Sequence, residues 1–312
     1  MVSELTSPRV ESDRAGLLRS LPLELAAHIR GQEHAVPRIC SVFTRGELGF
    51  ADPARPRGSF LLLGPTGVGK TRTFTVASQH LFGAPPLRFD MSEYQLKSSA
   101  EKLIGGPDRD EGLLGRAVGT RTEGTLLFDE MEKAHPNVLD LFLQILEDGR
   151  ITLASGRTLD LTGFYPGFTS NIGSAEVMRM VSAPFATIER TVLTRARQHL
   201  RPELFARITE KIVFGRLEYE TQRHICSDLI GIERRRLDRI GHQVEVTPAA
   251  LEFLVREGYH KHLGARPMRG AVERFIQDAV AARVLAGESG SGFLVVNETR
   301  DALMVARSAP AA

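Results

Sequence analysis

The chain has 312 residues, enough for two domains, and its composition is that of an ordinary globular protein. Its formal net charge of +2 is too small to favour general binding to nucleic acids or membranes. No stretch reaches the roughly 18 apolar residues of a membrane helix, and the N-terminus lacks the pattern of a signal peptide, so we expect a cytoplasmic protein without a membrane partner. Cys40 and Cys226 lie far apart among apolar neighbours, which favours buried free thiols over a disulfide or a metal pair.

In chain order, residues 1–22 are polar with little periodicity, and we expect a flexible N-terminal tail there, or a short helix. Apolar segments then alternate with helical patterns, which predicts an α/β domain with a parallel sheet flanked by helices over residues 23–214. The expected strands are residues 60–63, 87–90, 125–128, part of 159–170, and 211–214. An amphipathic helix is predicted between Pro136 and Gly149, directly after a pair of acidic residues.

From residue 215 the pattern changes to helices with little strand content, and we expect a smaller, mainly helical domain over residues 215–306. Thr247 and Pro248 mark the start of one helix, and a second follows over residues 267–286. Two strands are expected at 292–297 and 302–306, and residues 307–312 form a second tail.

A complete phosphate-binding motif follows the first predicted strand directly. Glycines in such a loop let backbone N–H groups and the N-terminus of the next helix point at phosphates. Lys70 is expected to reach the β- and γ-phosphates, and Thr71 to bind Mg²⁺. The motif therefore predicts a nucleoside triphosphate site made of Gly64, Pro65, Thr66, Gly67, Val68, Gly69, Lys70 and Thr71.

Two carboxylates follow the apolar strand 125–128. A strand of this kind ends beside the phosphate loop in nucleotide-hydrolysing proteins, so context distinguishes Asp129 and Glu130 from an ordinary solvated pair. Asp129 is expected to hold the Mg²⁺ shell, and Glu130 to polarise the water that attacks the γ-phosphate. This pattern predicts an enzyme that hydrolyses a nucleoside triphosphate.

Several further motifs, taken in order, resemble the Clp-type AAA+ ATPases, particularly the second ATPase module of the ClpB and ClpA unfoldases. The resemblance covers about residues 25–300. It implies an AAA+ large domain, a small lid domain, ATP and Mg²⁺ as cofactors, and a homo-oligomeric ring, by family a hexamer. The motifs are Arg30-Gly31-Gln32, the phosphate loop, Asp90-Met91-Ser92-Glu93-Tyr94, Asp129-Glu130-Met131-Glu132-Lys133-Ala134-His135-Pro136, Thr169-Ser170-Asn171, Arg201-Pro202-Glu203 and Gly264-Ala265-Arg266-Pro267.

The resemblance also implies roles for five residues outside the phosphate loop. Gly31 and Gln32 would border the adenine, and Asn171 would be the sensor that positions the attacking water. Arg207 matches the arginine finger that one subunit inserts into the site of its neighbour, and Arg266 matches the second sensor, carried by the small domain. Hydrolysis would then require assembly, and Arg266 would couple it to a hinge movement.

The sequence departs from the family in the loop that lines the central pore. Where unfoldases carry an aromatic residue, the segment 105–115 is shorter and charged, so we do not expect general threading of polypeptide. The second pore segment, residues 148–160, is retained, and we expect its arginines, Arg150 and Arg157, to face the channel. No tripeptide for docking a ring protease is found. In the strand before Asn171, Pro166 predicts either a late start near Phe168 or a bulge, and slow hydrolysis.

Three hypotheses follow. The leading one is a ring-forming, ATP-hydrolysing AAA+ remodeller that acts on a specific protein or complex. The second is an ATP-assembled scaffold, or one subunit of a mixed ring, with little turnover. The third is a nucleic-acid motor or loader whose channel is lined by Arg109, Arg150 and Arg157, against which the near-neutral charge and the absence of a recognisable nucleic-acid module weigh.

Overall fold

The computed structural model describes residues 8–106, 108, 110–260, 263–288 and 290–308. They form two compact units. The first comprises the described residues up to Pro65 together with Gly69–Gly215, and the second comprises Thr66–Val68 together with the described residues from Arg216 onward. Within the described ranges, no helix combines the length and the hydropathy that spanning a bilayer demands.

The first unit is built on a five-stranded parallel sheet in the order β2-β3-β6-β1-β7. All neighbouring strands are parallel, so each connection crosses over the sheet, and helices occupy these crossovers. The sheet confirms the predicted α/β class. Its strands are β1 (Phe60–Leu63), β2 (Leu87–Asp90), β3 (Gly124–Asp129), β6 (Phe164–Ser170) and β7 (Glu210–Val213).

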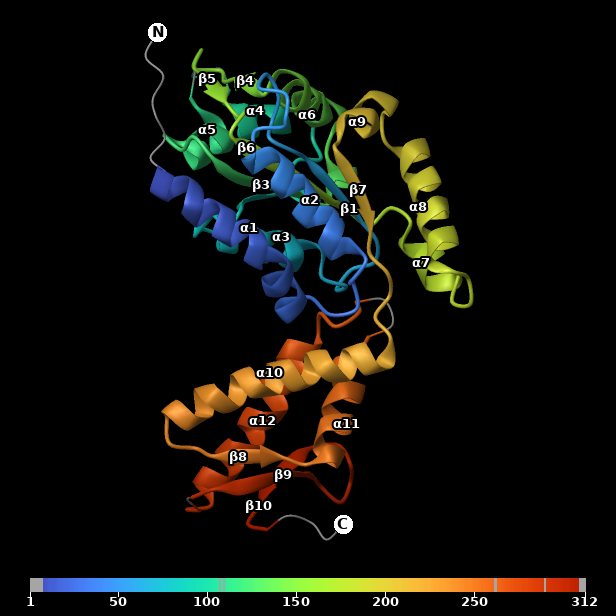
Figure 1. The fold of residues 1–312 in the computed structure, drawn as a ribbon. Coiled ribbons are helices and arrows are strands. Elements are labelled where there is room, and N and C mark those ends of the chain that lie inside the picture. Colours follow the sequence, from blue (N-terminus) through green and yellow to red (C-terminus); the bar gives the residue numbers. More distant parts are fainter. Residues whose placement is uncertain (1–7, 107, 109, 261–262, 289, 309–312) are drawn as a thin grey trace. The chain divides into compact units, whose positions relative to one another are not determined.

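Helices cover both faces of this sheet. One face packs against α2 (Ala35–Glu47) and α3 (Lys70–Phe82), and α1 (Pro8–His28) packs on these two helices, as Figure 1 shows. On that face the Phe60 ring lies 5.1 Å from Phe43 of α2 and 5.6 Å from Phe74 of α3. On the opposite face, Phe142 of α6 (Pro136–Asp148) lies 4.4 Å from Phe128 of β3. Alternation of side chains along the strands thus builds two apolar layers.

The remaining elements complete the first unit. Beyond the main sheet, β4 and β5 form an antiparallel hairpin within residues 148–160, the second segment that we expect to line a pore. The elements are η1 (Met91–Glu93), α4 (Ser99–Ile104), α5 (Gly112–Val118), η2 (Met131–Lys133), β4 (Arg150–Thr152), β5 (Thr158–Asp160), α7 (Ser174–Arg179), α8 (Phe185–His199) and α9 (Pro202–Arg207).

Of the two alternatives predicted for residues 1–22, the flexible tail is wrong for residues 8–22, and the structure has a helix there. They belong to α1, whose Leu18, Leu21 and Leu25 are buried. These leucines recur at i, i+3 and i+7, a helical spacing that the surrounding polar residues obscure. Residues 1–7, and residues 309–312 of the predicted C-terminal tail, lie outside the described part of the chain.

The strand before Asn171 starts early and runs without a bulge, contrary to both alternatives in our prediction. β6 pairs with β3 in continuous register from Phe164 to Phe168, through Pro166. On its other side β1 begins opposite Gly167. Pro166 therefore has a neighbouring strand on one side only, which is where a strand tolerates the missing N–H of proline.

The second unit packs three helices against a three-stranded sheet of order β10-β9-β8. Its helices are α10 (Tyr219–Arg239), α11 (Pro248–Gly258) and α12 (Met268–Leu285). Thr247 caps α11 through its side-chain oxygen, as predicted. The strands are β8 (Val244–Val246), β9 (Gly292–Val296) and β10 (Leu303–Ala306), of which β8 is absent from the prediction.

Candidate nucleotide-binding site

The phosphate loop connects β1 to α3, and its glycines have the backbone conformations that the motif requires. Gly64, Gly67 and Gly69 have φ of 132°, 76° and 108°, a region that L-residues with side chains rarely adopt. A Cβ atom on Gly64 would lie 2.5 Å from the carbonyl oxygen of Phe214, so no larger residue fits there. Gly69 is the N-cap of α3 and offers no side-chain cap, which leaves the N-terminus of α3 available to an anion.

Lys70 is buried at the start of α3 with its charge directed at backbone oxygens. Its Nζ donates to the carbonyl oxygens of Gly64 (2.5 Å) and Pro65 (2.8 Å) and to Oδ1 of Asn171 (3.0 Å). Burial lowers the pKa of Lys70 to about 8, although the nearby carboxylates of Glu132, Asp129 and Glu130 act in the opposite direction. A buried cation of this kind fits the phosphates of a nucleotide, which would compensate its desolvation.

Asp129, at the end of β3, is the buried carboxylate of the site. Oδ1 accepts hydrogen bonds from the hydroxyl groups of Thr71, at 3.4 Å, and of Thr169. Oδ2 pairs with the guanidinium of Arg88, at 2.5 Å. Thr71 and Asp129 therefore present a hydroxyl and a carboxylate oxygen side by side, the oxygen ligands that Mg²⁺ takes together with nucleotide phosphates.

Glu130 follows directly and has a left-handed backbone, with φ of 56° and ψ of 49°. This conformation is uncommon for a residue with a side chain and costs of the order of 1 kcal/mol. Its backbone N–H donates to the hydroxyl of Thr169 at 3.0 Å, which holds the turn in place. The carboxylate lies 3.9 Å from Lys133 Nζ and remains partly exposed, so water can reach it.

Asn171 lies just past the end of β6, next to the phosphate loop. Its Oδ1 accepts from Lys70, and its backbone N–H donates to Oε1 of Glu132 at 3.0 Å. The first unit therefore brings together Lys70, Thr71, Asp129, Glu130 and Asn171 at the carboxyl ends of three parallel strands, where ligands bind in open α/β sheets. The individual roles that we assign to them stay predictions.

Gln32 is fully buried and its side chain is committed to structure. Its Nε2 donates to the carbonyl oxygen of Gly215 at 3.0 Å, and its Oε1 accepts from the Gly215 N–H at 2.9 Å. Gly31 has φ of 71°, and its N–H donates to Glu33. If these residues border an adenine, as the resemblance implies, the side chain of Gln32 supports that site by holding the backbone of Gly215 in place.

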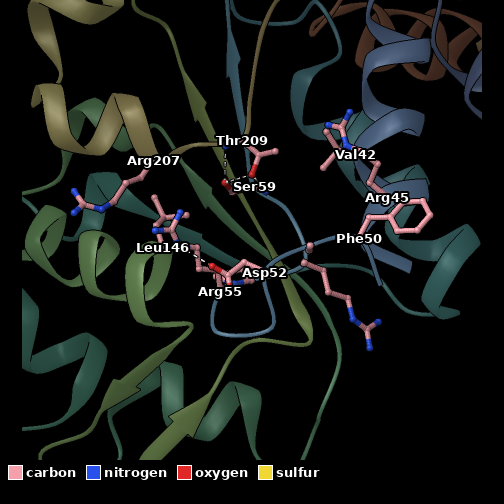
Figure 2. A pocket seen from close by; sticks show the side chains of 12 residues that line it. Val42, Arg45, Phe50, Asp52, Arg55, Ser59, Leu146, Arg207 and Thr209 are labelled. Atoms are coloured by element: carbon pink, nitrogen blue, oxygen red, sulfur yellow. Dashed lines mark hydrogen bonds and ion pairs between the residues drawn. The ribbon is translucent and has the colours of Figure 1, made fainter. Parts of the chain in front are cut away.

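Arg207, at the end of α9, lies apart from this cluster. It pairs with Glu147 of α6 at 2.5 Å and lines a pocket of about 250 Å³ (Figure 2). Arg45, Arg55 and the largely exposed Phe50 line the same pocket. In this position Arg207 contacts Glu147 and not the Lys70 of its own subunit. The position is compatible with action on the nucleotide of a neighbouring subunit.

Arg266 belongs to the second unit, where it is exposed and lies two residues before the start of α12. Its backbone N–H donates to the carbonyl oxygen of Leu263 at 3.1 Å. Its predicted action on the nucleotide remains a prediction.

Comparison with known families gives an independent assignment. Residues 55–211, just over half of the chain, match the model of the AAA domain (Cdc48 subfamily), and residues 217–295 match the C-terminal D2-small domain of ClpB protein. The chain is a Clp-type AAA+ ATPase. ATP with Mg²⁺ is the cofactor pair of this family, and the uncapped helix, the buried lysine and the hydroxyl–carboxylate pair described above fit it.

The relatives of this Clp-type ATPase include ClpB chaperones of several bacteria. It is 38% identical to the chaperone protein ClpB of Aquifex aeolicus over 96% of this chain and 32% of the relative. For ClpB 1 of a Nostoc species the values are 36%, 96% and 35%, and for ClpB of Meiothermus ruber 38%, 91% and 34%. The chain thus spans about a third of the length of these relatives.

Three residues of this Clp-type site have contacts that the sequence did not reveal. Thr169 links Asp129 to the backbone of Glu130, Glu132 holds the backbone of Asn171, and Arg88 neutralises Asp129. All three lie inside or beside motifs already recognised. The motifs are the only sequence signal that could have indicated these residues. The contacts themselves join residues about 40 positions apart, which local sequence pattern does not reveal.

The two segments expected to line a pore are joined to each other. Arg157 pairs with Glu111 at 2.9 Å and also donates to the carbonyl oxygen of Gly119, so it is not an isolated cation directed at a channel. The backbone N–H of Ala154 donates to the carbonyl oxygen of Ile104 at 2.9 Å. Arg150 is exposed, and Arg109 lies outside the described residues.

Proposed function

We propose that this Clp-type ATPase forms a ring, by family a hexamer, that hydrolyses ATP to remodel a specific protein client. The gathering of Lys70, Asp129, Glu130 and Asn171 at one edge of the sheet is the observation that carries the proposal. ATP supplies the γ-phosphoryl group, and Mg²⁺ neutralises its charge. In this geometry Glu130 accepts a proton from the attacking water, Lys70 stabilises phosphate charge, and Asn171 orients the water.

Assembly is proposed from the position of Arg207. A guanidinium that stabilises the transition state must lie near the γ-phosphate, and Arg207 instead lies in a pocket beside Arg45, Arg55 and Phe50. That pocket combines positive charge with exposed aromatic surface, which suits contact with the nucleotide-bearing face of a second copy. Replacement of Arg207 by Ala should leave ATP binding intact and lower turnover of the assembled protein.

A restricted client range is proposed from the pore segments. Glu111 lies in the segment where unfoldases of this family carry an aromatic side chain, and it pairs with Arg157 of the second segment. Charged groups must lose water to hold apolar polypeptide, which costs free energy. We therefore propose that the chain recognises a specific surface of one client and does not grip unfolded polypeptide in general. The relatives are described as chaperones, which is consistent with a protein client.

The test is a pull-down from the native host with the Glu130→Gln variant, with and without ATP. A stalled ring should retain the client that it normally releases, so a specific protein retained only with ATP supports the proposal. Lys70→Met is the matched control, because it should bind no ATP and retain nothing. Recovery of only the chain itself, or of another Clp-type subunit, would instead support the scaffold hypothesis.

The continuous register of β6 removes one argument for that scaffold hypothesis, because the sensor strand is not interrupted at Pro166. The nucleic-acid hypothesis loses the argument from Arg157, which is already paired. A salt titration of binding to single-stranded DNA tests the latter, and tight, strongly salt-dependent binding would revive it.

A further inference from the structure

Glu132 lies in η2, two residues after the proposed base Glu130, and its two carboxylate oxygens have different surroundings. Oε1 accepts the backbone N–H of Asn171 at 3.0 Å. Oε2 is buried and, among the described residues, has no hydrogen-bond partner. A buried acceptor left unpaired costs about 1–3 kcal/mol, so such an atom in a folded protein calls for a physical explanation.

The contacts around Glu132 cross-link two strand ends that carry the chemistry. Thr169 of β6 accepts the N–H of Glu130 and donates to Asp129, which ties β6 to the turn after β3. Glu132 makes the reverse connection, from the turn after β3 to the backbone of Asn171 after β6. The predicted base and the predicted sensor are therefore held at a fixed separation by two side chains.

Asn171 is held from a second direction by Lys70, whose Nζ donates to its Oδ1 at 3.0 Å. Its carbonyl oxygen accepts from Ser174, whose N–H lies at 3.1 Å and whose Oγ lies at 2.5 Å. Lys70 is a group that phosphates also attract, and Ser174 belongs to the segment after β6. Glu132 is therefore the contact that ties the backbone N–H of Asn171 to the turn after β3, which carries Glu130.

We propose that Glu132 is a positioning residue, which fixes Asn171 for hydrolysis through Oε1 and orders a water molecule in the nucleotide site through Oε2. This inference rests on the proposed role of Asn171 in hydrolysis. A water molecule is the ordinary partner of a buried polar atom that lacks a protein donor, and it places an ordered hydrogen-bond donor next to the sensor.

The experiment compares Glu132→Ala with Glu132→Gln, whose amide oxygen still accepts the Asn171 N–H. Glu132→Ala should lower kcat about 10- to 100-fold, the scale expected when a reacting group is misplaced, and change the Kd for ATP by less than about twofold. Amide hydrogen exchange in peptides covering residues 168–172 should accelerate in Glu132→Ala and stay near wild type in Glu132→Gln. Glu132→Gln should also recover most of kcat. Glu93→Ala, which removes an exposed carboxylate paired with Lys102, is the matched control and should change neither quantity.

A double-mutant cycle separates this inference from the assignment of the sensor. If Glu132 acts through Asn171, Glu132→Ala should cost little further activity in an Asn171→Ala background. A full additional loss there, or unchanged exchange at residues 168–172 in Glu132→Ala, would overturn the positioning role. Wild-type turnover by Asn171→Ala would show instead that the sensor assignment is wrong, and with it the purpose assigned to Glu132.

Discussion

Replacing Gly167 by Ala should destabilise the sensor strand. A Cβ atom at Gly167 would lie 2.6 Å from Cζ and 2.8 Å from both Cε atoms of Phe74, closer than real Cβ contacts allow. Phe74 is only 2% exposed, and its ring packs against Phe60 at 5.6 Å, so it has no free space to move into. Overpacking of this kind costs about 1–3 kcal/mol.

Urea unfolding followed by circular dichroism measures this loss. Gly16→Ala, in α1 of the same unit, is the matched control, because nothing lies within 4 Å of the added atom. Alanine in a helix is favoured over glycine by roughly 0.5–1 kcal/mol, so the control should gain stability. If Gly167→Ala were as stable as the wild-type protein, the close packing of β6 on α3 described here would be incorrect.

Two further predictions concern titratable groups. Burial favours a higher pKa for Glu123, but hydrogen bonds and charges from its two arginine partners outweigh burial and hold that pKa below its ordinary value of 4.5. The stabilisation from these ion pairs is therefore complete at a pH above 4.5 and is lost as the pH falls through the lowered pKa. In urea unfolding at decreasing pH, the free energy of unfolding should fall less steeply for Glu123→Gln than for the wild-type protein. An unchanged pH profile would contradict the ion pairs. Burial also raises the pKa of Cys40 to about 11 and of Cys226 to about 12, so neither thiol should react with an aromatic disulfide reagent at neutral pH until the protein is unfolded; rapid reaction of the native protein would show that a thiol is accessible.

The sequence was sufficient for the strands of the five-stranded sheet and for the proximity of the nucleotide motifs. Apolar runs that end in a glycine loop or in carboxylates predict parallel strands whose carboxyl ends meet, and Lys70, Asp129 and Asn171 do lie together. β8 escaped prediction because three residues are too few to show a period.

Other features depend on contacts between distant residues. The pairing of Gln32 with Gly215 joins positions 183 apart, and the contact of Glu132 with Asn171 joins positions 39 apart. Local pattern carries no information on such pairs. The error at Pro166 has the same origin, because its effect depends on where the neighbouring β1 begins.

The most direct measurement is steady-state ATP hydrolysis by the wild-type protein and by Glu130→Gln, with ATP binding measured on the same samples. The geometry predicts Mg²⁺-dependent turnover by the wild-type protein. Glu130→Gln should bind ATP with an affinity within about twofold of wild type, since Lys70 and the loop are intact, and should not turn it over. Comparable hydrolysis by Glu130→Gln would contradict the assignment of Glu130 as the base.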